Sequence, residues 1–136
     1  KLLPLADLVT PILPEAEALA EITIKNNADM KKAGQQLQAL GAKNVLVKGG
    51  HFNDQKQASD FVLLADGSSF WMSSPRIDTK RTHGTGDTIS ACITAELAKG
   101  VSMENAIRIG KAYVEATIRD GIQVGHGHGP LNHWAV

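Results

Sequence analysis

The sequence lacks several features that would direct a protein to the membrane or the cell exterior. It has a single cysteine, Cys92, so no internal disulfide can form, which fits a reducing compartment. No apolar run approaches the roughly 20 residues of a membrane span. The short apolar stretch after Lys1 does not have the pattern of a secretory signal peptide. These absences predict a cytoplasmic protein with no membrane partner.

The chain also lacks an excess of charge of either sign. Its 14 basic and 14 acidic residues give a formal net charge of zero and are spread along the sequence. Binding to a nucleic-acid backbone needs a basic face, so nucleic acid is not an expected partner. The 136 residues, 43% of them hydrophobic, are enough for one core and too few for two full domains. We therefore expect a single globular domain.

Hydrophobic patterning predicts strands that alternate with helices. Strands are expected where short apolar runs end in proline, glycine or a turn: 6–10, 44–48, and 60–64 with 69–72 around Asp66-Gly67. Helices are expected where apolar residues recur every three or four positions: 15–21, a helix capped by Asn26 or Asn27 and ended by Gly41, a helix closed by Gly100, and 103–118. This order predicts an α/β fold with helices and a sheet in three layers.

The strongest local motif is Gly84-Thr85-Gly86-Asp87, which opens one of the predicted helices. A helix start offers unpaired N–H groups and the positive end of the helix dipole, and both favour an anion. The two glycines let a phosphate approach the backbone closely. The carboxylate of Asp87 could accept a proton from an attacking hydroxyl. Taken alone, the motif is more typical of a turn followed by a helix cap than of an anion site.

A second candidate segment is Lys48-Gly49-Gly50-His51, which ends a predicted core strand. Nucleotide sites on α/β sheets lie at the carboxyl ends of strands, and a lysine there suits a phosphate. Taken alone, Lys48 is more typical of an ordinary strand end than of a nucleotide site, and His51 of an ordinary loop.

Five segments taken together resemble hydroxymethylpyrimidine or phosphomethylpyrimidine kinases of the ribokinase-like superfamily. The matching segments, in the family's order and spacing, are 8–17, 45–51, 76–80, 82–87 and 124–130. The resemblance covers essentially the whole chain and implies the C-terminal, nucleotide-binding half of a three-layer ribokinase-like domain, over residues 1–136. It also implies ATP- and Mg²⁺-dependent phosphorylation of a hydroxymethylpyrimidine and then of its monophosphate, in thiamine biosynthesis.

The resemblance assigns the catalytic part of the site to the helix start. Gly84, Thr85 and Gly86 match the family's anion hole. Asp87 matches the position of its catalytic base. The family pattern has Cys at this position, whereas ribokinase itself and many pyridoxal kinases have Asp, so the chemistry is retained while the substrate assignment is loosened.

The resemblance assigns the nucleotide and the metal to other segments. Lys48, Gly49 and Thr79 fall in segments that contact the nucleotide, and the loop from Gly125 to Gly129 borders it. Glu15 matches the acidic residue that supports magnesium through water. The family has Asn where Ile12 stands, and an apolar side chain cannot orient metal-bound water.

Family enzymes are about twice as long as this chain, and the other half carries the first strands of the sheet and most of the substrate pocket. The resemblance therefore predicts an exposed strand edge through which this piece can self-associate as a homo-oligomer, and little turnover by the piece alone.

Three other functions compete with the pyrimidine kinase. Asp87 favours a pyridoxal kinase of vitamin B6 salvage, because that family uses similar segments. Ile12 and the chain length favour a nucleotide-binding remnant without catalysis. The last alternative is an α/β module with a purely structural role, which predicts no response to ligands.

Overall fold

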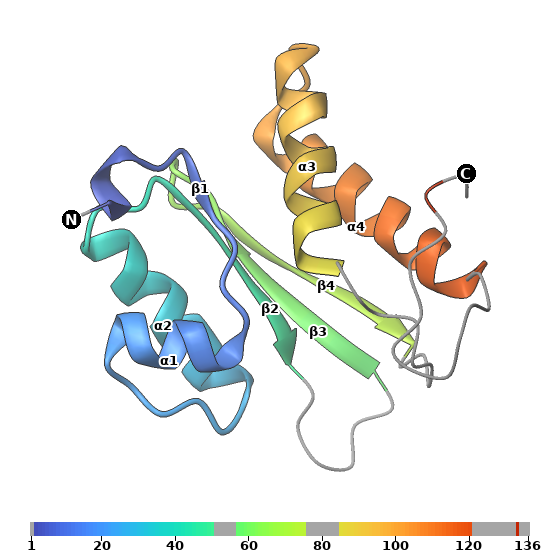
Figure 1. Cartoon of the computed structure of the whole chain (residues 1–136). Helices are drawn as coiled ribbons and strands as arrows, with labels where there is room; N and C mark the ends of the chain where they lie inside the picture. The colour runs from blue at the N-terminus through green and yellow to red at the C-terminus, as the bar shows by residue number, and fades with distance from the viewer. Residues whose placement is uncertain (1, 51–56, 76–84, 121–132, 134–136) are drawn as a thin grey trace. The chain divides into compact units, whose positions relative to one another are not determined.

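The computed structural model describes residues 2–50, 57–75, 85–120 and 133 (Figure 1). The chain forms two compact units, Lys1–Arg76 and Ile77–Val136. A four-stranded sheet with two helices makes up the described part of the first unit, and a pair of helices makes up most of the described part of the second.

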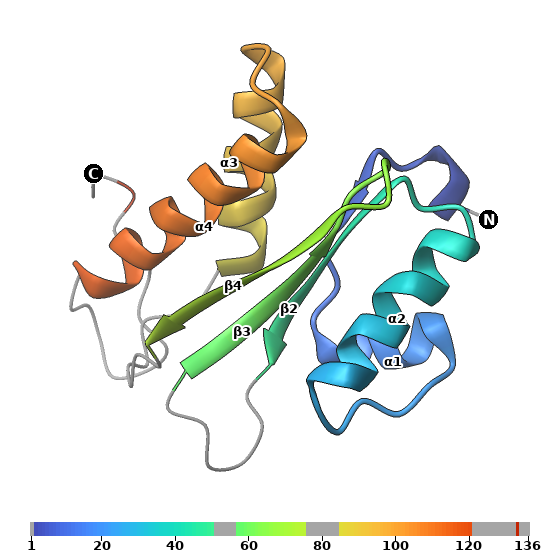
Figure 2. The ribbon, with the colours of Figure 1, turned by 180° about the vertical axis from the view of Figure 1, so that it is seen from behind.

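The sheet of the first unit has the strand order β1-β2-β3-β4. Its elements, in chain order, are the short 3-10 helix η1 Leu3–Leu5, β1 Leu8–Val9, α1 Leu13–Ala20, α2 Asn27–Ala39, β2 Asn44–Gly50, β3 Gln57–Leu63 and β4 Ser69–Pro75. Strand β2 is parallel to β1 and antiparallel to β3, and β3 and β4 form an antiparallel hairpin. Both views show α1 and α2 together on one face of this sheet (Figures 1 and 2).

Because side chains alternate between the two faces of a strand, one set of side chains from β2 and β3 packs against α1 and α2. Val45, Val47, Phe61 and Leu63 share a buried cluster with residues of α1 and α2. Between them in sequence, Leu46 and Val62 are fully buried outside that cluster, as expected for strands buried on both faces. Helix α2 lies very close to the sheet, since a Cβ atom on its Gly34 would lie 2.8 Å from Cε2 of Phe61.

The predicted elements are present, with shifts at their ends. Helix α1 begins at Leu13 rather than Glu15, because the missing N–H of Pro14 costs nothing in a first helical turn. Strand β1 is only two residues long, and β2 continues through Gly49 instead of stopping there. Asn26 caps α2 by accepting the N–H of Asp29 at 2.9 Å, as predicted.

The described part of the second unit is dominated by α3 Thr85–Ala98 and α4 Met103–Arg119, which pack against each other (Figure 2). Ile89 and Ile93 of α3 and Ile107 and Val114 of α4 are buried, as the spacing of apolar residues predicted. Gly100 follows α3 with a φ of 89°. Within the described residues, neither these helices nor any other is both long and apolar enough to cross a membrane.

Replacing Gly110 with valine should lower the free energy of unfolding by about 2–3 kcal/mol. A Cβ atom there would lie 2.8 Å from Cγ1 of Ile93, a side chain that is only 2% exposed and has no room to move away. Chemical denaturation measures the loss. The matched control is Ala112→Val at an exposed position of the same helix, which should cost about 0.5 kcal/mol or less. An equal loss of unfolding free energy in the two variants would show that the close packing at Gly110 contributes nothing to stability.

Candidate functional site

The carboxyl ends of β1 and β2 lie side by side and bring two predicted site segments together. The backbone N–H of Lys48 donates to the carbonyl of Pro11 at 2.9 Å, and Ile12 and Lys48 form a parallel β-bridge. The stretch that leads from β1 into α1 therefore runs along the end of β2. Since Glu15 lies three residues after this bridge, its segment and the Lys48-Gly49 segment adjoin at the carboxyl ends of the strands.

Glu15 is held at the start of α1 by its own helix. One carboxylate oxygen, Oε2, accepts the backbone N–H of Ile12 at 2.9 Å. Ile12 has no side-chain oxygen with which to bond an N–H of the first turn, so only half of a capping box can form. The bond fixes the direction of the Glu15 side chain, which stays exposed to solvent. The glutamate is thus positioned and still accessible.

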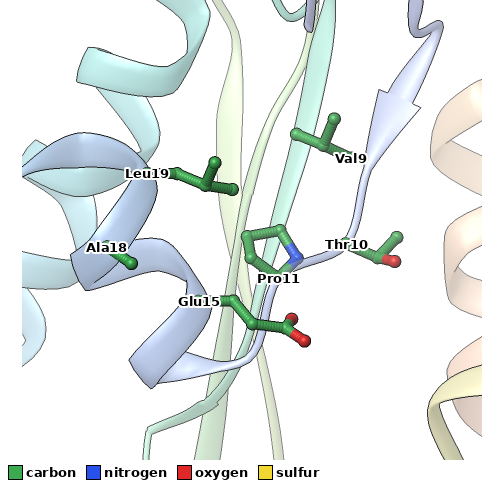
Figure 3. A pocket seen from close by; sticks show the side chains of 6 residues that line it. All are labelled: Val9, Thr10, Pro11, Glu15, Ala18 and Leu19. Atoms are coloured by element: carbon green, nitrogen blue, oxygen red, sulfur yellow. The ribbon is translucent and has the colours of Figure 1, made fainter. Parts of the chain in front are cut away.

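A groove of about 470 Å³ lies beside the edge strand β1. Figure 3 shows Glu15 and Leu19 projecting from α1 toward the segment that follows β1. The lining residues are mostly apolar, with one carboxylate and one hydroxyl among them: Val9, Thr10, Pro11, Glu15, Ala18 and Leu19. Leu19, one of the apolar lining residues, is 45% exposed.

Lys48 and Gly49 form an irregularity near the end of β2. The strand register passes from Val47 opposite Phe61 to Gly50 opposite Ser59, so these two residues face the single residue Asp60. This count defines a β-bulge. Gly49 has a φ of 84°, a conformation that favours glycine. Its N–H donates to Oδ1 of Asp60 at 2.8 Å.

The other predicted catalytic residues lie at the start of α3. Thr85 is the first helical residue, Gly86 follows, and Asp87 is the third and is exposed. In a helix of 14 residues the N–H groups of this turn have no carbonyl partner inside the helix, and the dipole adds partial positive charge. The first turn therefore offers an anion several donors next to a carboxylate.

Cys92, one and a half turns further along α3, does not replace the cysteine that the family pattern has at position 87. Burial raises the pKa of its thiol, and the nearby negative charge of Glu96 raises it further. The thiol therefore stays protonated at neutral pH and is a poor nucleophile or base. Asp87 is the better candidate for proton transfer in this helix.

The predicted residues thus fall into two described groups, one in each unit. Glu15, Lys48 and Gly49 belong to the first, and Thr85 to Asp87 to the second. Three further predicted residues lie outside the described residues: Thr79, Gly84 and Gly125.

A magnesium ion carried by a nucleotide would find limited but suitable chemistry here. Among residues 2–50, 57–75, 85–120 and 133, no group of three or more His, Cys, Asp or Glu side chains could hold a metal alone. Magnesium keeps several waters and is bound by one or two carboxylates together with phosphates. The exposed carboxylate of Glu15 fits that requirement, whereas the side chain of Ile12 does not.

The sequence predicts a strand that includes Asp60 but indicates no functional role for it. The structure shows its carboxylate buried, with 3% of the residue exposed, and bonded to the Gly49 segment. The available signal was an acidic residue at the head of the apolar run 61–64. A charge in a strand of this kind usually has a specific partner.

Comparison with known proteins gives one family. The model of the phosphomethylpyrimidine kinase family matches residues 1–132. The hydroxymethylpyrimidine/phosphomethylpyrimidine kinase of Haemophilus influenzae is 53% identical over 137 residues, covering 99% of this chain and 51% of that protein. The chain therefore spans about half the length of the curated relatives it matches.

Solved structures give the same fold. The ADP complex of Bacillus subtilis pyridoxal kinase matches with a TM-score of 0.90 and 37% identity, over 98% of this chain and 52% of that one. The Staphylococcus aureus pyridoxal kinase with AMP-PCP and pyridoxal matches with a TM-score of 0.91 and 34% identity, over 98% and 50%. These likenesses confirm the predicted α/β, ribokinase-like fold.

Proposed function

The chain belongs to the phosphomethylpyrimidine kinase family, and from this premise we propose that it is the nucleotide-handling half of a pyrimidine kinase. The enzyme would transfer a phosphoryl group from ATP to 4-amino-5-hydroxymethyl-2-methylpyrimidine and then to its monophosphate, for thiamine biosynthesis. Residues 1–136 would form the C-terminal part of one domain. The observation that carries the proposal is the exposed carboxylate of Asp87 in the first turn of α3, where the helix N–H groups have no carbonyl partner within the helix.

In this proposal the start of α3 handles the transferring group. The amides of Gly84 to Asp87 would stabilise negative charge on the phosphoryl oxygens, as hydrogen-bond donors aimed at developing charge do. Asp87 accepts the proton of the hydroxymethyl group as the hydroxymethyl oxygen attacks the γ-phosphorus, and the bond from the γ-phosphorus to the bridging oxygen breaks so that ADP leaves.

The nucleotide would lie along the ends of the strands. Lys48 and Gly49 contact its phosphates, and Thr79 and the Gly125 loop are proposed to border it. Glu15 orients water around magnesium, which when bound neutralises charge on the phosphates. The described contact between Pro11 and Lys48 supports a shared role for the Glu15 and Lys48 segments.

A pyridoxal kinase is the second candidate, because pyridoxal kinases are among the proteins similar in structure and the position of the family's cysteine holds Asp87. The test compares the two substrates in an enzyme of the relatives' full length that carries this chain. Our proposal predicts a higher kcat/KM with the hydroxymethylpyrimidine than with pyridoxal. A preference for pyridoxal would overturn the substrate assignment. Stabilisation by ATP without any product would indicate a nucleotide-binding protein without catalysis.

Ile12→Asn should tighten magnesium binding and raise the rate at low magnesium concentration. The amide would supply the polar group that Ile12 lacks beside Glu15. It would also cap α1 and stabilise the protein by about 1 kcal/mol. The control is Ile12→Ser, which caps the helix through a shorter side chain. Titration of activity with magnesium separates the effects: a gain only in melting temperature, equal in both variants, would show that Ile12 affects the helix alone.

A further inference from the structure

Two residues at the end of β2, Lys48 and Gly49, are opposed by one residue of β3, Asp60. An extra residue of this kind bends the strand and changes the direction of the side chains around it. The bulge therefore sets the path of the backbone in the segment that the proposed function assigns to the nucleotide. A contact that holds the bulge in place would therefore also determine how the Lys48-Gly49 segment binds a phosphate.

The carboxylate of Asp60 is one element that fixes it. Oδ1 of Asp60 accepts a hydrogen bond from the N–H of Gly49 at 2.8 Å, and this bond lies at the point where the strand register shifts. Because Asp60 is 3% exposed, little water competes for the bond.

The surrounding strand holds Asp60 rigidly. Its neighbours Phe61 and Val62 are almost completely buried, and its partner across the hairpin, Met72, is buried as well. Alternation places Asp60 on the same face of β3 as Val62, away from the cluster formed with α1 and α2. The Gly49 amide is therefore tied to a fixed point in the sheet.

We propose that Asp60 is a positioning residue for nucleotide binding: through the Gly49 amide it holds the Lys48-Gly49 bulge in the geometry that receives the phosphates. This inference deepens the proposed function and rests on it. Asp60 would act on ATP through the backbone without touching it. Its loss should therefore affect ATP binding and leave binding of the phosphoryl acceptor unchanged.

The test measures KM for ATP, KM for the hydroxymethylpyrimidine and kcat in an enzyme of the relatives' full length. Asp60→Ala should raise KM for ATP by roughly 10–100-fold, because small misplacements of a site are costly. Asp60→Asn retains an oxygen that can accept a hydrogen bond from the Gly49 N–H, so its KM for ATP should be close to that of the parent enzyme. KM for the pyrimidine should change by less than about twofold in both.

A second variant reaches the same bulge from the backbone. Gly49→Ala places its Cβ atom in open space but strains the backbone at a φ of 84°. It should also raise KM for ATP. This variant still tests the proposal if Asp60→Ala fails to fold. Two controls lie at the other end of the hairpin. Gly67→Ala strains a glycine with a φ of 89° and open space around it. Asp66→Asn alters a carboxylate that accepts the N–H of Ser68 at 2.8 Å. Neither control should change KM for ATP.

The outcomes separate this inference from the proposed function. Normal KM for ATP in Asp60→Ala and Gly49→Ala, with an active parent enzyme, would overturn the role of Asp60 alone. If the parent phosphorylates neither substrate, the affinity for AMP-PCP measured by calorimetry takes the place of KM, and the same loss and rescue are expected. A parent enzyme that does not bind AMP-PCP would contradict both.

Discussion

Asp87→Asn should lower kcat by about 10²–10⁴-fold while the affinity for ATP stays almost unchanged. Asparagine has nearly the same shape as aspartate and keeps the polar character of the first turn of α3. It cannot accept a proton from the attacking hydroxyl, so only the chemical step should suffer. Single-turnover kinetics with the hydroxymethylpyrimidine measure that step, and calorimetry with AMP-PCP measures the binding.

Asp29→Asn is a closely matched control for this variant. Asp29 is the third residue of α2, as Asp87 is of α3, so the substitution removes the same charge from the same helical position. Its carboxylate accepts the N–H of Lys25 at 2.9 Å and has no assigned role in catalysis. A loss of turnover in Asp29→Asn as large as in Asp87→Asn would show that a helix-dipole effect explains the result. Unchanged turnover in Asp87→Asn would remove the residue from the mechanism.

A polypeptide of residues 1–136 alone should show no measurable turnover of either substrate, whereas an enzyme of the relatives' full length should be active. The chain covers 51% of its Haemophilus influenzae relative. The apolar groove beside the edge strand β1, with Leu19 45% exposed, is the kind of surface that further sequence would cover. The resemblance to the family assigns most of the substrate pocket to that further sequence.

The matched control adds the other half as a separate polypeptide. If the two pieces assemble along β1, co-expression should restore turnover, and the 136-residue piece should lose any tendency to self-associate in sedimentation experiments. Robust turnover by residues 1–136 alone would contradict the prediction, because it would show a complete pocket within this chain.

The order of strands and helices could be predicted from the sequence because each element carries its own signal. Apolar spacing marked α3 and α4, Asn26 marked the start of α2, and Asp66-Gly67 marked the hairpin. The ends of elements were harder to predict. Nothing local showed that Pro14 would lie inside α1, since proline is compatible with either a break or a first turn.

Only those parts of the candidate site whose residues are contiguous in the sequence could be predicted. The first turn of α3 and the end of β2 were found because their motifs are contiguous. The role of Asp60 depends on its register opposite Lys48 and Gly49, ten or more positions away, and pairing of that kind leaves no local pattern. The contact between Pro11 and Lys48 depends on a parallel pairing across two helices in the same way.

The most direct test is a crystal structure of the full-length enzyme with AMP-PCP, magnesium and the hydroxymethylpyrimidine. We predict that the γ-phosphate accepts hydrogen bonds from the N–H groups at the start of α3. We also predict that the carboxylate of Asp87 lies within hydrogen-bonding distance of the substrate hydroxyl. A triphosphate bound elsewhere, with Asp87 turned toward an unrelated partner, would contradict the account.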